Sequence, residues 1–391
     1  DSIYEDDEVA TIAISDVSGG GATESGTQAV SITITENESA PVITMSASQT
    51  SAAENSGTEV TLTLTTSQIA DEDIVVSLSA SGTISSSDYV STSLSPSTIT
   101  ISAGSTTGTV SATPSDDSIY EGDESSTVSI SSVSGADAVE SGVQSITFTI
   151  TENESAPVIT MSASQTSAAE NSGTEVTLTL TTSQIADEDI VVSLSASGTI
   201  SSSDYVSTSL SPSTITISAG STTGTVSATP SDDSIYEGDE SSTVSISSVS
   251  GADAVESGVQ SITFTITENE SAPVITLATS TASVAENSGT TITLTATSSQ
   301  VADEDVVVTL ASSGTATNGT DYSSLGGQTI TITAGSTTGT ITGTPTDDSI
   351  YEDDEVAIIA ISSVSGGGAT ESGTQSVSIT ITENETAPTI T

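Results

Sequence analysis

The chain has 391 residues, of which 53 are acidic and none is Lys, Arg or His, so its formal net charge is −53. Ion pairs within the chain are impossible, and nucleic acid and anionic membranes are excluded as electrostatic partners because both require a basic surface. The chain also lacks Cys, which excludes disulfides, and without His, Lys, Arg or Cys we expect no enzyme.

Internal repeats organise the whole sequence. The segments 40–155 and 156–271 are identical, and 272–386 is a diverged copy. Residues 1–39 match the second half of that third copy, and 387–391 match the opening of another. We therefore expect half a module, three whole modules and the start of a further one, as part of a longer array. No apolar run is long enough to cross a membrane, so we expect no membrane insertion in this segment.

Within 40–155, apolar residues alternate with Ser and Thr at the period of two that is typical of β-strands. In chain order, the expected strands lie near 42–46, 60–64, 74–78, 99–101, 110–112, 128–130 and 146–150. Seven strands in a module of this size predict an immunoglobulin-like sandwich of two sheets. The predicted fold is all-β, with tandem seven-stranded sandwiches in an elongated array, because Ser155, Ala156 and Pro157 leave no room for a flexible linker.

The acidic residues of module 40–155 gather at four places in the chain. If consecutive strands run antiparallel, these four places meet at one end of the sandwich. Their nine members are Glu54, Asp88, Asp116, Asp117, Glu121, Asp123, Glu124, Glu152 and Glu154. Clustered carboxylates without His or Cys favour Ca²⁺ over Zn²⁺ or Cu²⁺, so we expect several Ca²⁺ ions per module.

This pattern resembles the Calx-β family, known from sodium–calcium exchangers and bacterial surface proteins. The resemblance lies in "AENSGT" (53–58), "TITITAGSTTGTITGTPTDDSIYEDDE" (329–355) and "VSITITENE" (377–385). It implies a seven-stranded sandwich that binds Ca²⁺ at one end, with Glu54, Asp88, Asp116, Asp117, Glu121, Glu124 and the 152–154 segment, which includes Asn153, as ligands.

The other modules carry the same candidate metal ligands. In module 156–271 they are Glu170, Asp204, Asp232, Asp233, Glu237, Asp239, Glu240, Glu268, Asn269 and Glu270. In module 272–386 they are Glu286, Asp321, Asp347, Asp348, Glu352, Asp354, Glu355, Glu383, Asn384 and Glu385. In the half-module they are Asp1, Glu5, Glu8, Glu36, Asn37 and Glu38.

Taken together, the sequence predicts an extracellular or cell-surface structural segment: a Ca²⁺-stiffened stalk or fibre of a prokaryotic adhesin, matrix or filament protein. The expected partners are calcium, neighbouring modules and other copies in fibres. Two alternatives stay open, a repeat module that binds glycan or a partner protein in cell adhesion, and a calcium sensor. Among the sequons, Asn318 is the better candidate for a glycan. The acidic triplets Asp187–Asp189 and Asp303–Asp305 are expected at the near ends of their modules, facing the preceding acidic cluster.

Overall fold

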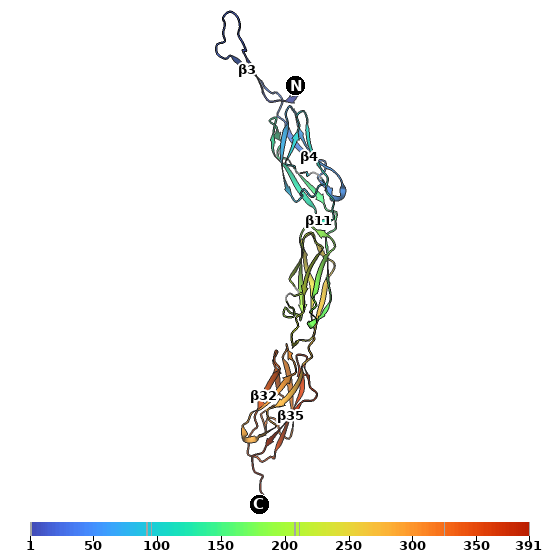
Figure 1. The fold of residues 1–391 in the computed structure, drawn as a ribbon, viewed down its shortest axis with the longest axis vertical. Coiled ribbons are helices and arrows are strands. Elements are labelled where there is room, and N and C mark those ends of the chain that lie inside the picture. Colours follow the sequence, from blue (N-terminus) through green and yellow to red (C-terminus); the bar gives the residue numbers. More distant parts are fainter. Residues whose placement is uncertain are drawn as a thin grey trace.

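The computed structural model describes residues 2–90, 93–94, 96–206, 209–210, 212–323 and 325–390. Three β-sandwiches lie end to end in one elongated row, and the half-module extends from the N-terminal end of that row (Figure 1). The predicted all-β class and the elongated tandem array are confirmed.

Each sandwich consists of one four-stranded and one five-stranded sheet. In module 40–155 the first sheet has the order β10 (Thr107–Ala112), β6 (Val60–Thr66), β4 (Val42–Ala47), β13 (Val139–Glu140). The second has the order β5 (Ser51–Ala53), β14 (Ser145–Thr151), β12 (Glu124–Ser134), β8 (Ile74–Gly82), β9 (Thr98–Ile101). Each of the seven longer strands contains one of the seven segments expected from the alternating pattern. The short strands β5 and β13 were not expected, and they pair in parallel at the sheet edges.

The other two modules repeat this arrangement. In module 156–271 the sheets are β21 (Thr223–Ala228), β17 (Val176–Thr182), β15 (Val158–Ala163), β24 (Val255–Glu256), and β16 (Ser167–Ala169), β25 (Ser261–Thr267), β23 (Glu240–Ser250), β19 (Ile190–Gly198), β20 (Thr214–Ile217). In module 272–386 they are β32 (Thr338–Gly343), β28 (Ile292–Ser298), β26 (Val274–Thr279), β34 (Thr370–Glu371), and β27 (Ser283–Ala285), β35 (Ser376–Thr382), β33 (Glu355–Ser365), β30 (Val306–Gly314), β31 (Thr329–Ile332).

The core of each sandwich lies between its two sheets. Along β6, Val60, Leu62 and Leu64 are buried, while Thr61, Thr63 and Thr65 point outward. This alternation follows from the pleat of a strand with one face on the core and the other in solvent. Phe148 is the one Phe of module 40–155 and is buried in the same cluster.

Consecutive modules are joined by short two-stranded parallel sheets. One strand of each pair comes from the acidic loop of one module, which in module 40–155 includes residues 116–124. The other strand comes from the near end of the next module. The three pairs are β1 (Ile3–Tyr4) with β7 (Ile69–Ala70), β11 (Ile119–Tyr120) with β18 (Ile185–Ala186), and β22 (Ile235–Tyr236) with β29 (Val301–Ala302). Backbone pairing across the joint restricts bending more than a covalent link alone. This pairing between modules was not among the features predicted from the sequence.

The half-module is a single hairpin of β2 (Glu8–Ala13) and β3 (Ala29–Ile34). Its apolar side chains have no covering sheet. Ile12 is 64% exposed, whereas the matching Ile359 of the third module is 0% exposed.

Candidate metal centre

Strand register brings the candidate ligands together at the far end of each module. Strand β5 pairs in parallel with β14, with Ala53 opposite Thr151. The residues that follow, Glu54 and Glu152, therefore lie side by side. Glu54 opens the short 3₁₀ turn η1 (Glu54–Ser56) and is only 5% exposed.

The first group of carboxylates consists of Glu54, Glu152 and Glu154. One oxygen from each lies within 4.8 Å of the other two. Glu152 is fixed by backbone amides, since its Oε2 accepts hydrogen bonds from Glu121 N–H at 2.6 Å and Gly122 N–H at 3.0 Å. The equivalent groups are Glu170, Glu268, Glu270 and Glu286, Glu383, Glu385. We call these sets the first triads.

The second group consists of Asp88, Glu121 and Glu124, whose oxygens also lie within 4.8 Å of one another. Asp88 comes from the loop after β8, Glu121 comes from the loop that leads into β12, and Glu124 is the first residue of β12. Gly82 allows the end of β8 to approach the start of β12, because a Cβ at this residue would lie 2.0 Å from the carbonyl oxygen of Ser125. Asp204, Glu237 and Glu240 form the same group in the next module. We call these sets the second triads.

Burial and mutual repulsion shift the pKa values of these groups. Burial, followed by the charge of Glu152, raises the pKa of Glu54 to about 7. Burial and the charge of Asp88 raise the pKa values of Glu121 and Glu124 to about 7. Burial alone would also raise the pKa of Glu152, but hydrogen bonds from the amides of Glu154 and Glu121 outweigh it and lower that pKa. Ionising both triads together is therefore unfavourable without a bound cation.

The donor atoms fit a calcium ion. Two oxygens that share one Ca²⁺, at 2.3–2.6 Å each, lie at most about 5 Å apart, and both triads meet this limit. Oε2 of Glu154 is buried and has no hydrogen-bond partner among the described residues, as is also true of Oε2 of Glu270 and of Glu385. A buried carboxylate oxygen in this state needs a proton or a metal ion.

The remaining predicted ligands of module 40–155 surround the triads or shape their loops. The charges of Asp117 and Asp116 act on Glu121 and Glu154, respectively. Asp123 Oδ1 accepts the amide hydrogen of Glu152 at 2.9 Å, and Asn153 Nδ2 donates to Glu154 Oε1 at 2.8 Å. These two side chains therefore hold the ligand loops in shape.

The same roles recur in the other modules. Asp239 and Asp354 accept the amides of Glu268 and Glu383, and Asn269 and Asn384 donate to Glu270 and Glu385. The amides of Asp233 and Asp348 donate to Glu170 and Glu286, while the charges of Asp232 and Asp347 act on Glu270 and Glu385. Glu355 shares a side-chain hydrogen bond with Asp321, and the charge of Glu352 acts on it.

The half-module holds part of such a site. Glu5, Glu8, Glu36, Asn37 and Glu38 line one cavity, and Glu5 N–H donates to Glu36 Oε2 at 2.5 Å. These residues correspond to Glu121, Glu124, Glu152, Asn153 and Glu154 of module 40–155. Asp1, also a predicted ligand, lies outside the described residues.

An acidic residue of the following module approaches the sites of modules 40–155 and 156–271 across the joint. The amide of Asp187 donates to the carbonyl of Tyr120 at 3.2 Å, one residue before Glu121. Burial, then the charges of Glu188 and Glu152, raise the pKa of Asp187. Asp303 repeats the contact with Tyr236 at 3.2 Å. The two triplets therefore lie at the near ends of their modules, facing the preceding site.

Comparison with known proteins identifies the repeat. The model of the Calx-beta domain matches residues 36–154, 152–270 and 268–385, which together span most of the chain. No curated protein matches the chain. Among the described residues, none forms a helix of the length and apolarity that a membrane crossing requires.

Solved structures resemble the chain only distantly. The structure of CBD12 from CALX1.2 is 15% identical, with 57% of this chain and 99% of that one covered and a TM-score of 0.25. The Yersinia pseudotuberculosis adhesin InvE is 14% identical, with 57% and 58% covered and a TM-score of 0.27. The bacterial integrin-binding protein invasin is 14% identical, with 88% and 60% covered and a TM-score of 0.26. At these scores the family assignment rests on the domain model alone.

Proposed function

The chain belongs to the Calx-beta domain family, and we propose that it is a structural repeat segment outside the cell, a stalk or fibre that calcium stiffens. Its modules would act as rigid spacers in a prokaryotic surface adhesin, matrix or filament protein. The observation that carries this proposal is the position of the carboxylate triads at the module ends, beside the joints.

Charge repulsion explains why bound cations would control the shape of the array. Two ionised carboxylates within 4.8 Å repel by about 3 kcal/mol at an effective dielectric constant of 20. Each triad contains three such pairs, so two fully ionised triads cost about 20 kcal/mol per module, which exceeds the typical stability of a domain. Protons or metal ions must therefore neutralise most of this charge in the folded module.

Calcium is the ion that these ligands favour. All candidate ligands are oxygens, and Mg²⁺ keeps more of its water and seldom enters a dense cage of carboxylates. Glu54, Glu152 and Glu154 would hold one ion, and Asp88, Glu121 and Glu124 a second, with Asp117 near both and Asp116 near the first. Sites of this kind in extracellular modules are tuned to about 10⁻⁴–10⁻³ M calcium.

The modules offer little support for a role as a glycan or partner receptor. Among the described residues of the two identical modules, the exposed large apolar side chains are valines such as Val143 and Val259. No aromatic residue of these described parts is among them. Isolated apolar side chains on a surface are ordinary and do not form a binding patch.

A calcium titration followed by small-angle X-ray scattering tests this function. We expect the maximum dimension of the chain to increase and its distribution of interatomic distances to extend to longer values as calcium is added to chelator-treated protein. Magnesium at equal ionic strength is the control. Equal effects of both ions would indicate a diffuse ion atmosphere and would refute discrete calcium sites.

A further inference from the structure

The joints contain an element that calcium does not explain. At the near end of the two identical modules, the turns Gly135–Ala138 and Gly251–Ala254 are closed by hydrogen bonds of 3.0 Å between their first and last residues. Their central residues have positive φ, 52° and 48° for Ala136 and Asp137, and 50° and 48° for Ala252 and Asp253. Ala is strained in this left-handed region, where Gly is the usual residue, whereas Asp adopts it at a smaller cost.

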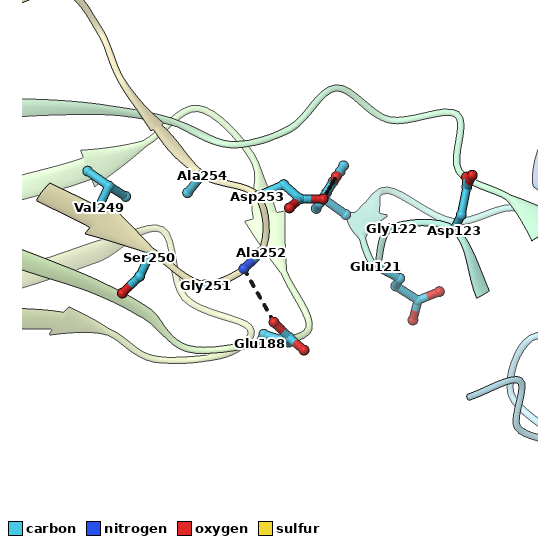
Figure 2. Close-up of a pocket in the computed structure, with 11 residues that line it drawn as sticks. Glu121, Gly122, Asp123, Glu188, Val249, Ser250, Gly251, Ala252, Asp253 and Ala254 are labelled. Carbon is cyan, nitrogen blue, oxygen red and sulfur yellow. Dashed lines mark hydrogen bonds between the residues drawn. The ribbon is translucent and has the colours of Figure 1, made fainter. Parts of the chain in front are cut away.

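A tyrosine of the preceding module docks on each strained turn. The hydroxyl of Tyr120 donates to Asp253 Oδ2 at 2.9 Å, and the hydroxyl of Tyr4 donates to Asp137 Oδ2 at 3.0 Å. Both tyrosines are buried although they project beyond their own modules. Figure 2 shows Asp253 on its turn, facing the segment that leads into Glu121 and Gly122, and Ala252 N–H donating to Glu188 at 3.3 Å.

The third joint has the same turn without the carboxylate. Gly366–Ala369 replaces it, with φ of 52° and 59° at Gly367 and Gly368. Glycine adopts these angles without strain. A Cβ at Gly368 would lie 2.6 Å from Cε1 of Tyr236, so the tyrosine ring packs directly on the turn. Among the described residues, the Tyr236 hydroxyl has no carboxylate acceptor like Asp253.

The corresponding tyrosine at the far end of the third module is Tyr351. Tyr351 is exposed, its hydroxyl donates to Asp353 Oδ1 in its own loop at 2.6 Å, and the neighbouring Ile350 is 61% exposed. No strand forms at these two residues. Among the described residues, the Ile–Tyr pairs at the three joints are paired as strands, and Ile350–Tyr351 is not.

We propose that the Asp-containing turns are sockets for the tyrosine of a preceding module, and that the tyrosine–aspartate bond makes two joints stiffer than the third. The partner that this surface fits is another module with an exposed Ile–Tyr pair. Strain at a residue that makes a specific contact is expected where the contact has a function. The joint at Gly368 has neither a strained turn nor a tyrosine–aspartate hydrogen bond, so it is the flexible point of the array.

Hydrogen exchange of the joint amides tests this proposal at a fixed, saturating calcium concentration. The amide of Asp187 donates to Tyr120 and that of Asp303 to Tyr236, so their exchange reports joint opening. Peptides covering 183–190 have the same sequence as 67–74 and report the first two joints together, whereas 299–306 reports the third alone. Tyr120→Phe affects only the second of these two joints, so exchange should accelerate about tenfold in half of the mass-spectrometric signal that the two identical peptides share. A change of about tenfold is expected for the loss of one hydrogen bond to a charged acceptor. Tyr236→Phe, the matched control, should leave 299–306 unchanged.

A second variant separates docking from folding. Asp253→Gly places at this turn position the residue that the third socket has at Gly368, which removes the bond and relaxes the backbone at residue 253 while Ala252 keeps its positive φ. We expect the melting temperature to stay equal or rise while the exchange of Asp187 accelerates. The proposal is overturned if Tyr120→Phe changes nothing, if Tyr236→Phe accelerates its joint by the same factor, or if Asp253→Gly leaves the joint protected.

Discussion

Without calcium, the array should lose stability as the pH rises from 5 to 7.5. Glu54, Glu121 and Glu124 have folded-state pKa values of about 7, against an ordinary value of 4.5. Between these values the folded module binds more protons than the unfolded chain. The stability that these groups contribute is therefore complete below pH 4.5 and is lost as the pH passes through 7.

The size of the effect follows from the pKa shifts. A rise from 4.5 to about 7 corresponds to about 3 kcal/mol for each group. Because these carboxylates border solvent, screening reduces this to about 1 kcal/mol each, or about 3 kcal/mol per module. For a domain of this size, that lowers the melting temperature by roughly 10 °C. Glu152, whose pKa is lowered, is ionised throughout the window and does not oppose the trend.

Calorimetry with and without calcium provides the assay. In excess chelator the melting temperature should fall steadily between pH 5 and 7.5 at constant ionic strength. In saturating calcium the trend should reverse, because the ions bind the deprotonated triads. Calcium binding at pH 6.5 should then release protons, which titrations in two buffers of different ionisation enthalpy can count. A calcium-free melting temperature that is constant or rises over this range would refute the burial of the triads.

Three further outcomes follow from the site. Chelation at pH 7.5 should lower the melting temperature by more than 10 °C, measured by calorimetry, because both triads then ionise without a counterion. Glu121→Gln should weaken calcium affinity about tenfold or more in titration calorimetry. The control Glu59→Gln removes the same charge at an exposed residue outside both triads and should change the affinity by less than twofold. Equal losses of affinity would argue for a diffuse ion atmosphere. Glu154→Gln should raise the calcium-free melting temperature by a few degrees while lowering the gain from calcium, because it removes a buried, unpartnered carboxylate oxygen.

Much of the fold could be predicted because the sequence repeats and alternates. The identical blocks define the array, and strict alternation along strands such as Val60–Thr66 fixes which face is buried. Antiparallel connections then place the acidic loops at one end. The division of these acids into two triads could not be predicted, because it depends on the parallel register that sets Glu54 beside Glu152 and on the close approach at Gly82.

Contacts between modules left a weaker trace in the sequence. The pairing of Tyr120 with Asp253 spans 133 residues, and it was not predicted from the sequence. Asn318 stays a candidate for a glycan. Its Nδ2 donates to the carbonyl of Gly326 at 3.0 Å and its Oδ1 accepts from Leu325 at 3.0 Å, so this side chain shapes its loop.

The distribution of charge connects the composition of the chain to its shape. The sheet faces carry Ser and Thr, as in the pair Thr127 and Thr147, whose hydroxyls lie 2.8 Å apart. The carboxylates instead collect at the ends of the modules, where β11 and β18 join one sandwich to the next. Repulsion in a uniformly acidic rod would act along its whole length and would affect mainly its solubility. Here the repulsion is concentrated at the points that can bend, so the cations that neutralise it act on the geometry of the joints more than on the sandwiches themselves.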